Sequence, residues 1–308
     1  MEQEVDSRIP DQIATWIEST LGPWALVADV SWPRSNSCVW QVRLGEADAF
    51  VKISPSAGAF HRERSALVDV LPGAMAATTP SLLGSADNLL TLTTSRVDGE
   101  VVRTLNPTPR ADVERAIHAR AGVALRPVHR QIEHFADLDV DRARSTRGSY
   151  LLELADRRLS GCLRMMGAED LRSIELAKEV LADAAEVCEL GFIHGDFQPR
   201  NWLWSTDRSE ISMIDFEESE IGYGVEDFAW LFATRWGRRD DLKNAFLEGY
   251  GRPLADSEWL FLAVFTLLRS LQHIVDGERL GIDEKISNGM RALKVSSRAL
   301  AELARVPR

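Results

Sequence analysis

The sequence predicts an α+β protein of two lobes: a small N-terminal lobe with a five-stranded antiparallel sheet and a helix, and a large lobe that is mostly helical. Three observations support this class. Five short segments with the character of strands precede residue 95, apolar residues at helical spacing dominate after residue 110, and 308 residues suffice for two lobes. We place the boundary between residues 96 and 97, giving lobes 1–96 and 97–308.

The N-terminal lobe begins with a predicted helix over residues 11–21, because Ile13, Trp16, Ile17 and Leu21 fall on one face. Gly22 and Pro23 follow and end it. Strands are predicted over residues 25–30, 38–44, 49–53, 80–83 and 89–94. A further helical segment, HRERSALVDVL, lies between the third and fourth strands and carries Glu63.

The C-terminal lobe is predicted to contain helices over residues 111–129, 169–190, 242–250, 256–275 and 283–303. Gly191 is expected to end the second of these. Two short strands, 202–204 and 211–214, bracket the turn TDRS. Residues 130–148 are polar with few periodic apolar positions, so we expect a long connection there.

Composition excludes several classes of protein. A formal charge of −11 argues against a nucleic-acid partner, which usually requires a basic field. The three cysteines are far apart and indicate neither a disulfide framework nor a zinc site. The first ten residues are acidic and polar, unlike a signal peptide, and the apolar run 259–268 is too short to span a bilayer. We therefore expect a cytoplasmic protein without a membrane partner.

The most informative stretch runs from Phe192 to Glu217 and contains FIHGDFQPRNWLW and, after a turn, EISMIDFE. Asp196 is followed five positions later by Asn201, and Asp215 comes after another short strand. Phosphoryl transfer needs one carboxylate that orients an attacking hydroxyl and two hard oxygen ligands for magnesium. Asp196 alone would more simply be a turn residue that caps backbone amides. Together with Asn201 and Asp215, it indicates a catalytic loop.

The motifs HGDFQPRN and IDFE resemble the aminoglycoside phosphotransferase family of small-molecule kinases, which have a protein-kinase-like fold. The resemblance implies that residues 1–96 form a nucleotide-binding lobe, with ATP or GTP as donor, and that residues 97–308 form the catalytic and substrate-binding lobe. It implies that Asp196 is the catalytic residue and that Asn201 and Asp215 hold Mg²⁺.

Further nucleotide-binding residues follow from this resemblance. Lys52 closes an apolar strand and Glu63 comes eleven residues later in a helix, the arrangement of the kinase ion pair. The Ser95 carbonyl and the Val97 amide are expected to receive the base, and Gly99 to supply the turn after this hinge. The loop SWPRSNS lacks the glycines of a kinase phosphate loop. Ser35 and Asn36 could bind phosphate there, or belong to an ordinary hairpin turn.

Other residues near the motif receive structural or open assignments. By the same resemblance, His194 is expected to pack inward, and Asp227 to brace the catalytic loop. The roles of Arg200 and Glu217 stay open. Trp32 and Trp236 lie in loop-like contexts and are candidates for stacking on a ligand.

The acceptor is the least determined feature. Residues 131–164, which the resemblance places over the substrate pocket, contain six acidic and six basic residues. A pocket for a polycationic aminoglycoside would be expected to show an acidic excess. We therefore extend the leading role, inactivation of a hydroxylated antibiotic, to nucleoside and peptide types. The alternatives are a metabolic kinase for choline, a sugar or an amino-acid hydroxyl, and an inactive nucleotide-binding scaffold. Only eleven residues separate Asp215 from Asp227, too few for a long activation segment, so no protein substrate is expected.

Overall fold

The computed structural model describes residues 8–32, 37–73, 75, 77–135, 137–186 and 188–304. The chain forms two compact units. The first comprises Met1–Leu105 and Pro199–Ser219, and the second Asn106–Gln198 and Glu220–Arg308. The boundary was expected between residues 96 and 97. The first unit instead also includes residues 97–105 and the segment 199–219 that follows the catalytic loop.

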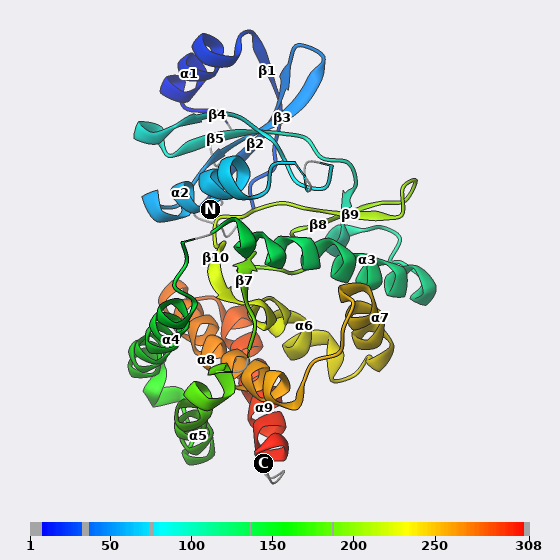
Figure 1. Cartoon of the computed structure of the whole chain (residues 1–308). Coiled ribbons are helices and arrows are strands. Elements are labelled where there is room, and N and C mark those ends of the chain that lie inside the picture. Colours follow the sequence, from blue (N-terminus) through cyan, green and yellow to red (C-terminus); the bar gives the residue numbers. More distant parts are fainter. Residues whose placement is uncertain are drawn as a thin grey trace. The chain divides into compact units, whose positions relative to one another are not determined.

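The first unit is built on a five-stranded antiparallel sheet (Figure 1), which confirms the predicted fold class. Its strands are β1 (Trp24–Asp29), β2 (Cys38–Leu44), β3 (Ala47–Ile53), β4 (Leu82–Ala86) and β5 (Thr91–Ser95), in the order β1-β2-β3-β5-β4. The predicted fourth strand begins two residues late, because Pro80 cannot donate to a ladder and pairing starts after it.

Apolar side chains fix one helix onto this sheet. Helix α1 (Asp11–Leu21) buries Ile13 and Ile17 against Trp40 and Val42 of β2 and Val51 of β3. Helix α2 (Ala57–Ser65) begins where the Ser56 hydroxyl accepts a hydrogen bond from the Ala59 amide, at 3.2 Å, and it continues into a π-helical turn, Ala66–Val70.

A small second sheet completes the first unit and contains β6 (Glu100–Val101), β8 (Trp202–Ser205) and β9 (Glu210–Met213). Gly99 precedes β6 with φ +119°, and a Cβ there would lie 2.9 Å from the backbone of Leu203 and of Trp204. The glycine predicted to make the turn is therefore also required by close contact between chain segments.

The second unit is mostly helical, as predicted. Its helices are α3 (Ala111–Arg130), α4 (Val140–Cys162), α5 (Ala168–Glu186), the short α6 (Ala229–Leu231), α7 (Asp240–Tyr250), α8 (Asp256–Leu280) and α9 (Asp283–Leu303). Strands β7 (Leu190–Ile193) and β10 (Glu220–Tyr223) pair antiparallel beside them. In Figure 1, α8 runs between α4, α5 and α9, all of which it contacts.

The long connection predicted over residues 130–148 is wrong. A 3₁₀ turn, Gln131–His134, leads to the 23-residue helix α4, which begins at the capping residue Asp139. The buried stripe of α4 consists of Arg147, Leu151, Ala155 and Cys162. Because an arginine occupies one of its positions, the apolar periodicity that identifies a helix is interrupted.

The helix predicted over residues 169–190 ends earlier, at Glu186, and Gly191 is not its cap. Gly191 lies in β7, where a Cβ would stand 3.1 Å from the His129 carbonyl oxygen. The glycine therefore permits close packing of a strand on α3 rather than ending a helix.

Helix α8 is longer than the apolar run in the sequence indicated. Among the described residues it alone has the length and composition to cross a membrane, and 72% of its most apolar 18-residue window is buried inside the protein. Burial of this kind is typical of a core helix, so the feature is weak evidence for a membrane span.

Candidate active site

The Lys52 ammonium is surrounded by three carboxylates in the first unit. Its Nζ lies 2.7 Å from Glu63 Oε2, 2.6 Å from Asp215 Oδ1 and 2.8 Å from Glu217 Oε2. The predicted pair of Lys52 with Glu63 is therefore present, and the structure adds Asp215 and Glu217 to it. Sequence reasoning left Glu217 open because nothing in its spacing indicates which residue it contacts.

Three elements bring this cluster together. Lys52 lies in β3, paired with Val39 of β2 and Leu92 of β5, and Glu63 lies in α2 with 5% of its surface exposed. Asp215 follows β9 in a left-handed conformation, with φ +71°. A non-glycine residue in this region costs about 1–3 kcal/mol and is frequent at functional sites.

Charge and burial oppose each other at Lys52. Burial alone would lower the pKa of Lys52, but Glu63, Asp215 and Glu217 together raise it well above its ordinary value. The pKa of Glu63 is raised by burial, although the Lys52 charge opposes that shift. Lys52 therefore remains a cation held between its three carboxylates.

The β8–β9 hairpin brings Asn201 and Asp215 close together along the chain. Trp202 pairs with Met213, and the Ile214 amide donates to the Asn201 carbonyl oxygen at 3.1 Å. Asn201 is 3% exposed, whereas the Asp215 side chain is 31% exposed. Both predicted magnesium ligands thus lie at the open end of one hairpin.

The acids of the first unit suit a hard cation. Carboxylate oxygens of Glu63, Asp215 and Glu217 all lie within 4.8 Å of one another. Mg²⁺ prefers such oxygen ligands together with phosphates and water. Because the Lys52 ammonium contacts the same three oxygens, the donor set fits a metal shared with a bound polyphosphate better than an isolated metal.

The catalytic loop belongs to the second unit, where Asp227 supports its backbone. Asp227 Oδ2 accepts from the His194 amide and Oδ1 from the Gly195 amide, both at 2.8 Å, and His129 Nε2 lies 3.0 Å from Oδ2. The bracing predicted for Asp227 is confirmed. His194 is fully buried, and its Nδ1 accepts from the Asp196 amide at 3.3 Å, which confirms its structural role.

Asp196 is half-buried at the turn of this loop. Its Oδ1 accepts a hydrogen bond from Gln198 Nε2 at 2.5 Å. Gly195 before it has φ +80°, which explains a glycine at this position, and its carbonyl oxygen accepts from Arg269 Nη2 at 2.9 Å. Hydrogen bonds therefore hold both the carbonyl before Asp196 and the Asp196 carboxylate.

The remaining predicted nucleotide contacts are mixed in outcome. Ser95 ends β5, and its hydroxyl accepts from the Ser81 amide at 2.9 Å. Among the described residues, no backbone group accepts a hydrogen bond from the Val97 amide, and its contact with the base stays a prediction. Ser35 and Asn36 lie outside the described residues. The neighbouring Ser37 is described, and its hydroxyl lies 3.5 Å from Glu217 Oε2.

Trp32 and Trp236, the two candidates for stacking on a ligand, differ in solvent exposure. Trp236 is 3% exposed and packs against Phe228, Phe246 and Trp259, so it is a core residue and not a ligand platform. Trp32 is 45% exposed, and the Arg103 guanidinium lies 5.5 Å from the centre of its ring.

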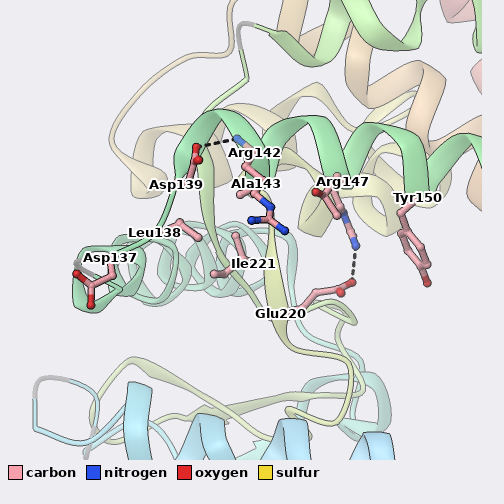
Figure 2. A pocket seen from close by; sticks show the side chains of 10 residues that line it. Asp137, Leu138, Asp139, Arg142, Ala143, Arg147, Tyr150, Glu220 and Ile221 are labelled. Carbon is pink, nitrogen blue, oxygen red and sulfur yellow. Dashed lines mark hydrogen bonds and ion pairs between the residues drawn. The ribbon is translucent and has the colours of Figure 1, made fainter.

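The second unit contains a cavity of about 550 Å³ between α4 and β10. Figure 2 shows Arg147 ion-paired with Glu220 across it, Tyr150 at one end, and the Arg142 guanidinium pointing toward Ile221. Its volume is in the range of small-molecule sites. Sequence reasoning missed it because α4 was taken for a connection.

Comparison with known proteins extends these observations. The family model described as the phosphotransferase enzyme family matches residues 28–265. A search of curated proteins by sequence finds no significant match.

Solved structures share the fold at low identity. The GDP complex of an aminoglycoside 2′-phosphotransferase of type IIIa is 11% identical, with a TM-score of 0.69 over 94% of this chain and 99% of that chain. A thermostable mutant of the aminoglycoside phosphotransferase APH(4)-Ia, in ternary complex with AMP-PNP and hygromycin B, is 16% identical, with a TM-score of 0.66 over 94% and 98%. The family match covers most of the chain, and the chain therefore belongs to the APH phosphotransferase enzyme family, whose members are small-molecule kinases with a kinase-like fold.

Proposed function

We propose that the protein transfers the γ-phosphoryl group of ATP or GTP to a hydroxyl group of a small molecule. The observation that carries the proposal is the cluster of Lys52, Glu63 and Asp215 at 2.6–2.7 Å. In this assignment Lys52 binds the phosphates, and Asn201 and Asp215 hold Mg²⁺, which would neutralise charge on the phosphates when bound. Similar folds in complex with GDP, AMP-PNP and ATP support a nucleotide donor.

The proposed reaction uses Asp196 to orient the acceptor. Its carboxylate accepts a hydrogen bond from the attacking hydroxyl and takes its proton as the bond to the γ-phosphorus forms. The bond between the γ-phosphorus and the bridging oxygen breaks, and the nucleoside diphosphate leaves. Lys52, fixed by its three carboxylates, stabilises the negative charge on the phosphates without reorganising.

The acceptor proposed first is a hydroxylated antibiotic, which would make this a cytoplasmic resistance enzyme. Similar folds with bound kanamycin, gentamicin and hygromycin B support an antibiotic role. The equal numbers of acidic and basic residues in 131–164 favour acceptors other than polycations, such as nucleoside or peptide antibiotics. The same balance favours a second candidate, a metabolic kinase for a sugar or an amino-acid hydroxyl. Protection of a sensitive host supports the first role, and growth rescue of a metabolic mutant the second.

Replacing Asp196 tests the enzymatic assignment. We expect Asp196→Asn to lower kcat by about a hundredfold or more, because the group that orients and deprotonates the hydroxyl is lost. The measurement is nucleotide turnover with Mg²⁺ over a library of alcohols, with phosphorylated product detected by mass. Asp207→Asn, an exposed acid in the β8–β9 turn, is the matched control. Equal rates for Asp196→Asn and the wild type would remove the enzyme assignment in favour of a nucleotide-binding scaffold.

A further inference from the structure

In the second unit, Arg269 on α8 contacts the catalytic loop, and Arg158 on α4 contacts α8 near Arg269. Arg269 Nη2 donates to the Gly195 carbonyl oxygen at 2.9 Å, next to Asp196 in the chain. Arg158 Nε donates to Gln272 Oε1 at 2.7 Å, and Gln272 lies three residues after Arg269 on α8. Both arginines are half-buried. Helix α8 is therefore hydrogen-bonded to the catalytic loop through Arg269 and to α4 through Gln272.

Among the described residues, the two guanidinium groups carry positive charge that no carboxylate pairs with. Within the described part of the chain, no acid forms a salt bridge with Arg158 or Arg269. Asp276 is the acid whose charge reaches Arg158, but it lies 3.4 Å from Arg279 and 3.8 Å from Lys285. Two neighbouring guanidinium groups bonded to neutral oxygens keep an uncompensated positive charge that would attract an anion.

Charge interactions connect Arg158 with Arg269, and both Arg269 and Asp196 with His273. Burial lowers the pKa of Arg158 to about 10, and the Arg269 charge acts in the same direction. Arg158 still remains protonated at neutral pH. His273, one turn after Arg269, is within electrostatic range of both Arg269 and Asp196. Tyr150, which lines the cavity in Figure 2, is within range of Arg158.

We infer that Arg158 and Arg269 bind an anionic group of the acceptor beside Asp196, so that the substrate is an alcohol carrying a carboxylate or phosphate rather than a polycation. This inference rests on the proposed phosphotransferase function and specifies its acceptor. Arginine forks bind such oxyanions with two parallel hydrogen bonds. The positive charges of Arg158 and Arg269 would repel a cationic acceptor. They would attract an anionic acceptor, whose negative charge compensates them.

The test uses acceptors that differ only in their anionic group. Glycerol is compared with glycerate and glycerol 3-phosphate, and glucose with gluconate and glucose 6-phosphate, with kanamycin and gentamicin as polycations. Transfer from ATP with Mg²⁺ is measured as kcat/KM. We expect the anionic member of a series to exceed its neutral counterpart by about tenfold or more, and the carboxylate and phosphate arms separate the two oxyanions.

Substitutions of Arg158 test whether this residue causes the preference for an anionic acceptor. We expect Arg158→Met, which keeps the apolar stem, to raise KM for the preferred anionic acceptor by about ten- to a hundredfold. Arg158→Lys keeps the charge and should recover part of this loss. Arg157→Met removes the same charge from the neighbouring exposed residue and should change KM by less than about twofold.

The possible outcomes separate this inference from the proposed function. Preference for neutral or polycationic alcohols overturns the inference and leaves the kinase assignment intact. So does binding of ATP with Mg²⁺ without transfer to any anionic acceptor. An equal rise in KM for ATP in Arg158→Met would show that the arginine serves the nucleotide, which also overturns it. Absence of nucleotide binding, measured by fluorescence titration, would instead contradict the proposed function.

Discussion

At the scale of single residues, the site depends on charges held at fixed positions. Lys52 is compensated by Glu63, Asp215 and Glu217, and Asp227 accepts two backbone hydrogen bonds from the catalytic loop. If Lys52 or Asp227 is removed, its partners lose a counter-charge or a hydrogen-bond acceptor, and the folded state becomes less stable. Substitutions at this scale should therefore alter stability and ligand binding together.

Removing the Lys52 charge should convert its cluster into a metal site. In Lys52→Met, three carboxylates within 4.8 Å lose their common cation and repel one another. We expect the free energy of unfolding to fall by about 1–3 kcal/mol. Millimolar Mg²⁺ should restore more stability to this variant than to wild type, as measured by thermal unfolding without nucleotide.

The control for this experiment is Lys294→Met, an exposed lysine on α9. It should show the same Mg²⁺ dependence as wild type. A Mg²⁺ response in Lys52→Met no larger than in the control would show that the three acids do not act as one cluster.

His118 should make stability depend on pH. It is 3% exposed, and burial lowers its pKa from 6.5 to about 4. Above pH 6.5 the ring is neutral in both folded and unfolded chains. As the pH falls from 6.5 to 4, the unfolded chain binds a proton that the folded protein rejects, so stability is lost by about 3 kcal/mol over this window.

Urea unfolding between pH 7.5 and 4.5 measures this effect. His118→Gln should show a flatter profile than the wild type, whereas His134→Gln, which replaces an exposed histidine, should follow the wild type. Parallel profiles for the wild type and His118→Gln would assign the acid sensitivity to other groups.

At the scale of elements, α4 is attached to the second unit by charge as well as by apolar contact. Arg147 forms a bidentate ion pair with Glu226, in which Nε donates to Oε1 and Nη2 to Oε2. Its Nη1 lies 2.7 Å from Glu220 Oε1. Glu226 Oε1 also accepts from the Tyr223 amide at 3.0 Å. This network holds α4 against β10 and the turn that follows it, and thereby shapes the cavity in Figure 2.

Breaking this network from one side should be costly. Arg147→Met leaves Glu226 buried without its cation, and we expect a loss of about 3–5 kcal/mol in the free energy of unfolding. Adding Glu226→Gln should restore part of that loss, because the uncompensated charge disappears. Urea titration measures both variants. Arg142→Met, one turn earlier with an exposed guanidinium, is the control, and a single-variant loss below about 1 kcal/mol would contradict the account.

At the scale of the whole molecule, the chain combines a sheet-based first unit with a helical second unit, and residues 199–219 return to the first. This return explains why Asn201 and Asp215 group with Lys52, although the motif is continuous with Asp196. The nucleotide-binding residues proposed here therefore all belong to one unit, and Asp196 and the arginine pair belong to the other.

A nucleotide should stabilise the folded protein measurably. With AMP-PNP and Mg²⁺ at a hundred times the Kd, linkage predicts about 2.7 kcal/mol of added stability. Thermal unfolding with AMP-PNP, compared with adenosine at equal concentration, measures it. Adenosine lacks the phosphates that Lys52 is proposed to bind and should give a much smaller shift. Equal shifts would argue that the phosphates are not recognised by this cluster.

The sequence by itself determined the fold class and the five strands, because alternation and helical spacing are local signals. A motif of some twenty residues and a lysine that closes a strand also singled out Asp196, Asn201, Asp215 and Lys52, whose roles stay predictions. Tertiary structure alone decided that Glu217 contacts Lys52, that Arg147 is buried, that Arg269 contacts Gly195 and that Arg158 contacts Gln272. From a sequence, a charged residue is normally assigned to the solvent-exposed surface. Its ion-pair partner is known only from the folded structure, because that partner usually lies in a distant segment. For that reason the sequence alone could name candidate residues for phosphoryl transfer, whereas it could not indicate helix α4 or the arginine pair.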